Sequence, residues 1–167
     1  MSAARIAVYT GSFDPFHRGH ENIARRAAAL FDRVIVGVGE NPDKAVCFSA
    51  AERVAAIAAT LADVPNMVVR AFPGLTVQFA RAEGARVLLR GVRALADVEY
   101  EFTMTLMNST LDAGLETVFL MADKEFGHLS SSLIRQIARF GGALDAMAPA
   151  PVVAQLRKKF GAAGPAA

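Results

Sequence analysis

The segment 9–20, which reads YTGSFDPFHRGH, combines side chains and turns that are suited to binding an anion. It joins a short apolar stretch to the first helical pattern, and it holds the Ser12 hydroxyl and two histidines, His17 and His20, on either side of Gly19. A strand-to-helix junction presents unpaired N–H groups at the positive end of the helix dipole, where anions bind. The spacing therefore indicates a site for phosphate groups.

The same segment also has a purely structural interpretation. Gly11 could only permit a tight turn, Asp14-Pro15 is an ordinary turn pair, and a single histidine more often packs or caps a helix than reacts. Two histidines that flank a glycine at a helix start favour a functional role, for His20 more than for His17. A metal site is the weaker alternative, because no cysteine or carboxylate has suitable spacing.

Other parts of the chain add residues that suit phosphate. In 90–93 (RGVR) two arginines bracket a glycine, and arginine binds phosphate through a planar two-point contact. The serines 130–132 precede a helical apolar stripe; one would serve as the N-cap, and three offer further hydroxyl and N–H groups. For Lys44, in a short loop, and Glu101, in a helical stretch, spacing alone does not decide between a functional role and a solvated surface.

Short β-branched runs alternate with helical patterns along the chain. The expected strands read as nearly continuous apolar runs, as strands covered on both faces should, and they span 5–10, 33–39, 67–72, 86–90 and 116–121. Helices are expected between them, a short one after Gly74 and a longer one over 96–111. Ser49 and Glu52 have capping-box spacing, so the second helix is expected to begin at Ser49.

This alternation predicts α/β architecture, with a single Rossmann-like domain whose five-stranded parallel sheet carries helices on both faces. Ligands bind such sheets beyond the carboxyl ends of the strands. The candidate phosphate ligands obey that rule, since they follow the five strands in turn as 11–20, Lys44, Thr76, 90–93 and 130–132. The domain is expected to span 1–160, including a last short helix, with a frayed tail at 161–167.

The composition limits the class of protein. The chain has 167 residues, of which 53% are hydrophobic and 20% charged, which argues for one core and against disorder. A net charge of +2 suits a small anionic substrate and indicates no nucleic-acid-binding face. Cys47 is alone, so neither a disulfide nor a cysteine metal cluster is expected. The sequence shows no secretory signal and no membrane-spanning run, which predicts a cytoplasmic protein without membrane contact.

The chain resembles the bacterial phosphopantetheine adenylyltransferases, which belong to the nucleotidyltransferase superfamily with a His-x-Gly-His motif. Matching blocks cover nearly the whole length: 11–15 with Gly19 and His20; 90–93 with Asp97, Glu99, Tyr100 and Glu101; Met107-Asn108; and Ser130, Ser131 and Ser132. The block at Arg90 separates this family from relatives that act on nicotinate mononucleotide or glycerol phosphate. The family often has Thr at the position of Ser12, and Thr or another residue at His17, which makes His17 the weaker member of the pair.

The resemblance implies transfer of the adenylyl group of ATP to 4′-phosphopantetheine, giving dephospho-coenzyme A and pyrophosphate in the penultimate step of coenzyme A synthesis. An ionised phosphate that attacks in line needs no general base or covalent nucleophile, so positioning and charge stabilisation remain for the protein. Mg²⁺ is expected to bridge the ATP phosphates with few protein ligands. The alternatives are a related nucleotidyltransferase with another acceptor, such as nicotinate mononucleotide, and a non-catalytic nucleotide sensor or weak nucleic-acid binder on the same fold.

The resemblance also implies roles for individual residues. His20 would stabilise the transition state at the α-phosphate, Lys44 and Arg90 would hold the acceptor phosphate together with Ser12, and Thr76 would line the acceptor's path. ATP would contact Ser12, Phe13, His20, Gly91, Val92, Arg93, Glu101, Phe126, Gly127, His128, Leu129, Ser130, Ser131 and Ser132. No residue is expected to be a dedicated metal ligand.

The family forms homohexamers, and coenzyme A is expected to inhibit by occupying the same site. The long helix carries apolar side chains that spread further round it than one core-facing stripe requires, namely Met104, Leu106, Met107 and Leu111. Contact with another subunit and deep burial within the monomer explain this spread equally well.

Overall fold

The computed structural model describes residues 4–41, 45–93 and 95–161, and its elements follow the predicted alternation. They are β1 (Ile6–Gly11), α1 (Arg18–Leu30), β2 (Arg33–Glu40), α2 (Ala50–Thr60), β3 (Met67–Pro73), α3 (Thr76–Ala82), β4 (Val87–Val92), α4 (Leu95–Leu111), β5 (Glu116–Met121), the 3₁₀ turn η1 (Lys124–Phe126), α5 (Ser131–Arg139) and α6 (Ala150–Phe160). The predicted capping box is confirmed, because Ser49 accepts a hydrogen bond from the Glu52 N–H and the Glu52 carboxylate accepts one from the Ser49 N–H.

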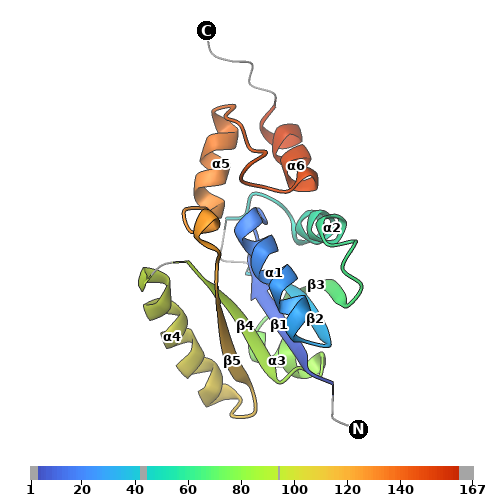
Figure 1. Cartoon of the computed structure of the whole chain (residues 1–167), viewed down its shortest axis with the longest axis vertical. Helices are drawn as coiled ribbons and strands as arrows, with labels where there is room; N and C mark the ends of the chain where they lie inside the picture. The colour runs from blue at the N-terminus through green and yellow to red at the C-terminus, as the bar shows by residue number, and fades with distance from the viewer. Residues whose placement is uncertain (1–3, 42–44, 94, 162–167) are drawn as a thin grey trace.

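The five strands form one parallel sheet in the order β3-β2-β1-β4-β5, which confirms the predicted fold class. The chain moves outward from β1 to β3 and then crosses to β4 on the other side of β1. The loops that follow β1 and β4 therefore diverge at the point where ligands bind in open α/β sheets. In Figure 1, α5 and α6 lie beyond this end of the sheet.

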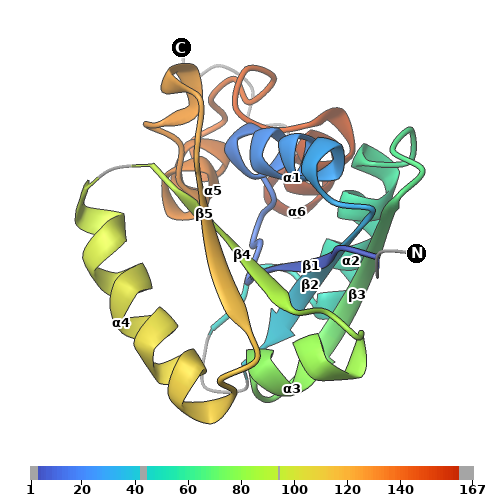
Figure 2. The same cartoon turned by 60° about the horizontal axis from the view of Figure 1, so that its bottom comes forward.

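Helices cover both faces of the sheet, as Figure 2 shows with α1 and α6 on one side and α3 and α4 on the other. One core cluster joins α1, α2, α5 and α6 to the strands through buried side chains such as Ile23, Ile57, Ile134 and Leu156. A smaller cluster around Phe79 packs α3 against the opposite face.

The expectation that every strand is covered on both faces is wrong for the edge strand β5. Glu116, Phe119 and Met121 are exposed and the other three side chains are only partly buried, because α4 packs on the sheet mainly through β4. Deep burial of the apolar α4 side chains within the monomer is also wrong. The exposed large apolar residues of this region are Val98, Tyr100, Phe102, Met104, Leu106, Met107, Leu111, Phe119 and Met121.

The C-terminal helix α6 ends at Phe160, the last residue of the expected domain. The expected frayed tail lies, from residue 162 onward, outside the described residues. In the part of the chain that the structure describes, none of the helices has the length and apolar character needed to cross a membrane.

Candidate active site

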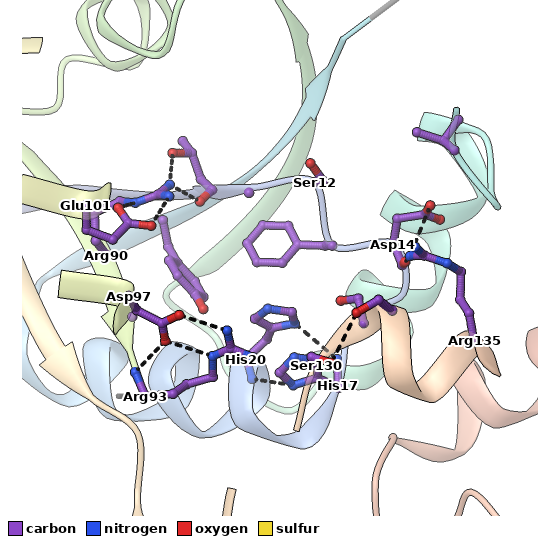
Figure 3. A pocket seen from close by; sticks show the side chains of 18 of the residues that line it. Ser12, Asp14, His17, His20, Arg90, Arg93, Asp97, Glu101, Ser130 and Arg135 are labelled. Atoms are coloured by element: carbon purple, nitrogen blue, oxygen red, sulfur yellow. Dashed lines mark hydrogen bonds and ion pairs between the residues drawn. The ribbon is translucent and has the colours of Figure 1, made fainter. Parts of the chain in front are cut away.

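A pocket of about 430 Å³ opens at the switch point between β1 and β4. The loop after β1, the end of β4, the start of α4 and the start of α5 all contribute to its wall (Figure 3). The predicted residues that the structure brings together here are Ser12, Phe13, His20, Arg90, Gly91, Arg93, Glu101, Ser130, Ser131 and Ser132. Most of the predicted set thus shares one cavity although it comes from four parts of the sequence.

His17 and His20 form a reciprocal cap at the N-terminus of α1. His17 is the N-cap, and its Nδ1 accepts from the His20 N–H at 3.4 Å, while His20 Nδ1 accepts from the His17 N–H at 3.2 Å. The two rings stack with centroids 3.6 Å apart. Both rings border the pocket, but His17 is only 2% exposed and is the N-cap of α1, so it serves chiefly to shape the loop.

This geometry fixes the protonation state of His20. Burial, the adjacent His17 imidazole and the charges of Arg93 and Arg90 hold the pKa of His20 well below its ordinary value, so the ring is neutral at pH 7. Because Nδ1 accepts from the His17 N–H, the proton of the neutral ring resides on Nε2. Burial lowers the pKa of His17 to about 3 in the same way. His20 is thus held as a neutral hydrogen-bond donor, a form that suits a phosphate oxygen.

Gly19 lies in a tightly packed part of the motif. A Cβ at this position would lie 3.1 Å from the His17 ring and 3.5 Å from the Phe126 Cβ. A side chain at this position would therefore crowd the His17 ring, which would have to shift by a few tenths of an ångström. The space beside Gly19 is filled by the His17 ring and the Phe126 side chain.

Arg90 is oriented by a two-point ion pair with Glu101. Its Nε and Nη2 donate to the two Glu101 carboxylate oxygens at 2.6 Å each, and Nη1 donates to the Thr10 carbonyl at 2.7 Å. Glu101 was predicted as a nucleotide contact, but here its carboxylate is engaged by Arg90. The neighbouring Tyr9 hydroxyl is buried, which raises its pKa and keeps it protonated.

Arg93 is held by a similar pair with Asp97, which accepts from Nε and Nη2 at 3.0 Å and also from the Arg93 N–H at 3.0 Å. A third donor, Nη1, reaches the Leu129 carbonyl at 2.5 Å. The contact ties the end of β4 to the segment that leads into α5. In Figure 3 the two arginine–carboxylate pairs occupy one side of the pocket, and Ser130 lies across from them.

Ser130, Ser131 and Ser132 make different hydrogen bonds. Ser130 is the N-cap of α5 and accepts from the Leu133 N–H at 3.2 Å. Ser131 donates to the Pro15 carbonyl at 2.9 Å, which joins α5 to the loop after β1. Ser132 is exposed, and its hydroxyl lies 3.2 Å from that of Ser130. One serine therefore caps the helix and the others are available to shape or contact the pocket.

Asp14 and Arg135 are among the pocket residues for which the sequence predicts no individual role. Asp14 is 6% exposed and accepts from the Cys47 and Phe48 N–H groups at 2.6 and 2.9 Å. Arg135 donates to the Asp14 carbonyl oxygen and forms a longer ion pair of 3.7 Å with its carboxylate. A signal for Arg135 was present, because its spacing of three residues from Ser132 places both on one helix face.

Several predicted residues lie outside the main pocket. Thr76 lines a neighbouring cavity of about 50 Å³, which shares Arg90 and Glu101 with the pocket. Lys44 lies outside the described residues, although its neighbours Ala45 and Val46 line the pocket.

Several residues that are predicted to contact ATP do not line the main pocket. Val92 and Leu129 have buried side chains, which leaves only their backbone for ligand contact. Phe126 packs near Gly19, and Gly127 follows it in the turn after η1. His128 is exposed at the surface beside Glu125. Contacts of these residues with ATP stay predictions.

The carboxylates of the pocket are engaged by the protein. Asp14, Asp97 and Glu101 each pair with an arginine, and no cluster of three histidine, cysteine or acidic residues within the described ranges could hold a metal ion. The described wall therefore offers cations, hydroxyls and N–H groups to an anion.

The chain is similar to known proteins over nearly its whole length. Residues 8–137 match the family model described as cytidylyltransferase-like. The chain is 48% identical over 160 residues to the phosphopantetheine adenylyltransferase of Desulforudis audaxviator, an alignment that covers 96% of this chain and 98% of that protein. It is 46% identical to that of Clostridium tetani, over 92% and 96% of the two chains, and 47% identical to that of Moorella thermoacetica, over 94% and 98%.

Proposed function

The chain belongs to the cytidylyltransferase-like family and, within it, to the phosphopantetheine adenylyltransferases, and we propose that its pocket joins ATP to 4′-phosphopantetheine. An oxygen of the acceptor phosphate attacks the α-phosphorus of ATP. The bond between that phosphorus and the oxygen bridging to the β-phosphate breaks, and pyrophosphate leaves with the electron pair. The products are dephospho-coenzyme A and pyrophosphate.

The placement of Arg90 carries the proposal. Its guanidinium borders both the main pocket and the small cavity lined by Thr76, Tyr100 and Asn108. A phosphate held at Arg90 could therefore extend a narrow arm into the small cavity while its own oxygens face the main pocket. Phosphopantetheine has this shape, with one phosphate at the end of a flexible chain. Lys44 and Ser12 would complete the phosphate contacts.

His20 would act on the charge that develops during transfer. Its neutral ring carries the Nε2 proton, and a preoriented donor stabilises the equatorial oxygens of the α-phosphorus without reorganising in the transition state. No described group is required to remove a proton, because the acceptor phosphate is ionised near neutral pH. Arg93, Arg135, Ser130 and Ser132 would hold the ATP phosphates.

We further propose that Mg²⁺ arrives with ATP, because the pocket carboxylates are paired with arginines and a metal carried by phosphate oxygens suits such a site. When bound, the ion neutralises charge on the phosphates that leave. The protein's own part is to position these phosphates opposite the acceptor.

A panel of acceptors tests the proposal. Pyrophosphate release is measured in a coupled assay with ATP and Mg²⁺, with 4′-phosphopantetheine, nicotinate mononucleotide and glycerol phosphate supplied in separate reactions. Release is expected with 4′-phosphopantetheine. Activity confined to nicotinate mononucleotide, the acceptor of the alternative nucleotidyltransferase, would refute it, and calorimetric ATP binding without any transfer would point to a nucleotide sensor.

Assembly and regulation belong to the same proposal. The exposed apolar surface over α4 and β5 suits contact with further copies of the chain, and the family resemblance makes the expected assembly a hexamer. Coenzyme A shares the pantetheine arm with the substrate, so it is expected to compete with 4′-phosphopantetheine. The protein is proposed to act in the cytoplasm, where ATP is supplied.

A further inference from the structure

Arg53, in α2, is a buried cation that donates to the backbone of three separate segments. The residue is 4% exposed. Its Nε donates to the Phe48 and Ser49 carbonyls at 3.0 and 3.3 Å, and its Nη1 donates to the Ser12 carbonyl at 2.5 Å and the Gly39 carbonyl at 3.3 Å. Within the described residues it has no carboxylate within 4.0 Å. The hydrogen bonds to the Phe48 and Ser49 carbonyls are enough to anchor Arg53 at the start of α2. They do not explain why Arg53 also donates to the Ser12 carbonyl.

The contact with Ser12 fixes the direction of a backbone N–H in the pocket wall. A trans peptide is planar, so the Ser12 carbonyl and the Phe13 N–H lie in one plane and point in opposite directions. Because Arg53 holds the carbonyl on its own side, the Phe13 N–H is directed away from Arg53. Among the described residues this N–H has no protein acceptor. Ser12 and Phe13 both line the pocket, with Ser12 at its edge (Figure 3).

The same peptide is under strain that the contact helps to maintain. Phe13 has φ 47°, in the left-handed region that residues with a side chain rarely adopt. Such a conformation costs of order 1–3 kcal/mol and persists only where surrounding contacts impose it. Arg53 holds one side of the peptide. On the other side the Phe13 ring packs edge-on against Tyr9 and His20, with centroids 5.2 and 5.0 Å apart.

Arg53 also joins this loop to the loop before α2. The Phe48 N–H donates to the Asp14 carboxylate, whereas the Phe48 carbonyl accepts from Arg53. The loop after β1 and the end of the loop after β2 are thus clamped together through both groups of one residue. A change at Arg53 would release the Ser12 peptide from this clamp while leaving Asp14 in place.

We propose that Arg53 is a positioning residue for adenylyl transfer, whose guanidinium orients the Ser12–Phe13 peptide so that the Phe13 N–H and the Ser12 hydroxyl meet a substrate phosphate. The inference rests on the proposed function. Arg53 itself touches no substrate. Its removal is expected to lower kcat more than it raises KM, since a displacement of about 1 Å in a reacting group can cost 10²-fold in rate.

Two substitutions and one control test the role kinetically. In R53K the charge remains, but a single ammonium cannot reach all four carbonyls; in R53M both charge and donors are lost. R25M is the control, because Arg25 also donates from a helix to a backbone carbonyl, that of Thr60, and its carboxylate partners are Glu21 and Asp63. None of these partners lines the pocket, whereas Ser12, a partner of Arg53, does. At a temperature where circular dichroism shows each variant folded, kcat is expected to fall about 10- to 100-fold in R53K and R53M and to stay at the wild-type value in R25M.

A crystal structure of R53K supplies a readout that is independent of activity. The Ser12 carbonyl is expected to rotate, and the Phe13 φ to leave the left-handed region. Wild-type kcat in folded R53K, or an unchanged Ser12–Phe13 peptide, would overturn the inference, and R53K serves alone if R53M does not fold. If the wild-type protein fails to use 4′-phosphopantetheine, the proposed function fails, while the peptide rotation still tests what Arg53 does.

Discussion

Replacing His20 by alanine removes the donor that the structure holds ready for the α-phosphate. The ring is neutral, its Nδ1 is bonded to the His17 N–H, and it is stacked on His17 at 3.6 Å, so its orientation is fixed before substrate binds. Loss of one preoriented donor of this kind costs about 10²–10³-fold in kcat, or roughly 2.7–4 kcal/mol of transition-state stabilisation. Ground-state affinity should change much less.

The assay is steady-state pyrophosphate release with ATP and 4′-phosphopantetheine, which gives kcat and both KM values. Alanine also removes half of the reciprocal cap at α1, which costs about 0.5–2 kcal/mol of stability, so the thermal midpoint is measured alongside. His20→Gln is the matched variant, since glutamine at this helical position can accept from the N-cap N–H. It is expected to recover stability while kcat stays at least about 10-fold low. Unchanged kcat in H20A together with lost ATP binding would refute the assigned role.

Three further expectations follow from the same geometry. His17→Thr should keep the N-cap and stay within about 1 kcal/mol of the wild-type stability, whereas His17→Ala should lose about 0.5–2 kcal/mol, which chemical denaturation measures; equal stability of the two variants would contradict the capping role. The pKa values of His17 and His20 are lowered in the folded protein, so the unfolded chain binds more protons than the folded one below pH 6.5. The free energy of unfolding should therefore fall by about 2 kcal/mol from His17 alone between pH 6.5 and 5. NMR should show neither ring titrating between pH 5.5 and 8. The double substitution F102E/L106E on the exposed face of α4 should shift light scattering from six times the 17.7 kDa chain mass to smaller species, and an unchanged mass would place the subunit contact elsewhere.

The sequence predicted the fold well because its signals are local. Continuous apolar runs locate the five strands, and the Ser49–Glu52 spacing locates a helix start, since both depend on neighbouring residues alone. The exposure of β5 could not be predicted from its apolar run, because a strand at the edge of a sheet and one at its centre can share the same composition.

Most of the candidate residues line one pocket, but the ion pairs among them could not be predicted from the sequence. Arg90 and Glu101 are far enough apart in sequence that only the packing of α4 beside β4 shows them as an ion pair. Arg53 carries no motif, and its role depends on carbonyls from three segments that only the folded chain brings together. The exchange of cap bonds between His17 and His20 likewise required the geometry of the helix start.

The most direct test of adenylyl transfer to 4′-phosphopantetheine is product analysis in a competition reaction. The protein is incubated with ATP, Mg²⁺ and equal amounts of 4′-phosphopantetheine and nicotinate mononucleotide, and the products are identified by mass spectrometry and ³¹P NMR. The account predicts dephospho-coenzyme A and pyrophosphate in equal amounts, with nicotinate mononucleotide left intact. Formation of the nicotinate dinucleotide, or release of pyrophosphate without dephospho-coenzyme A, would contradict it.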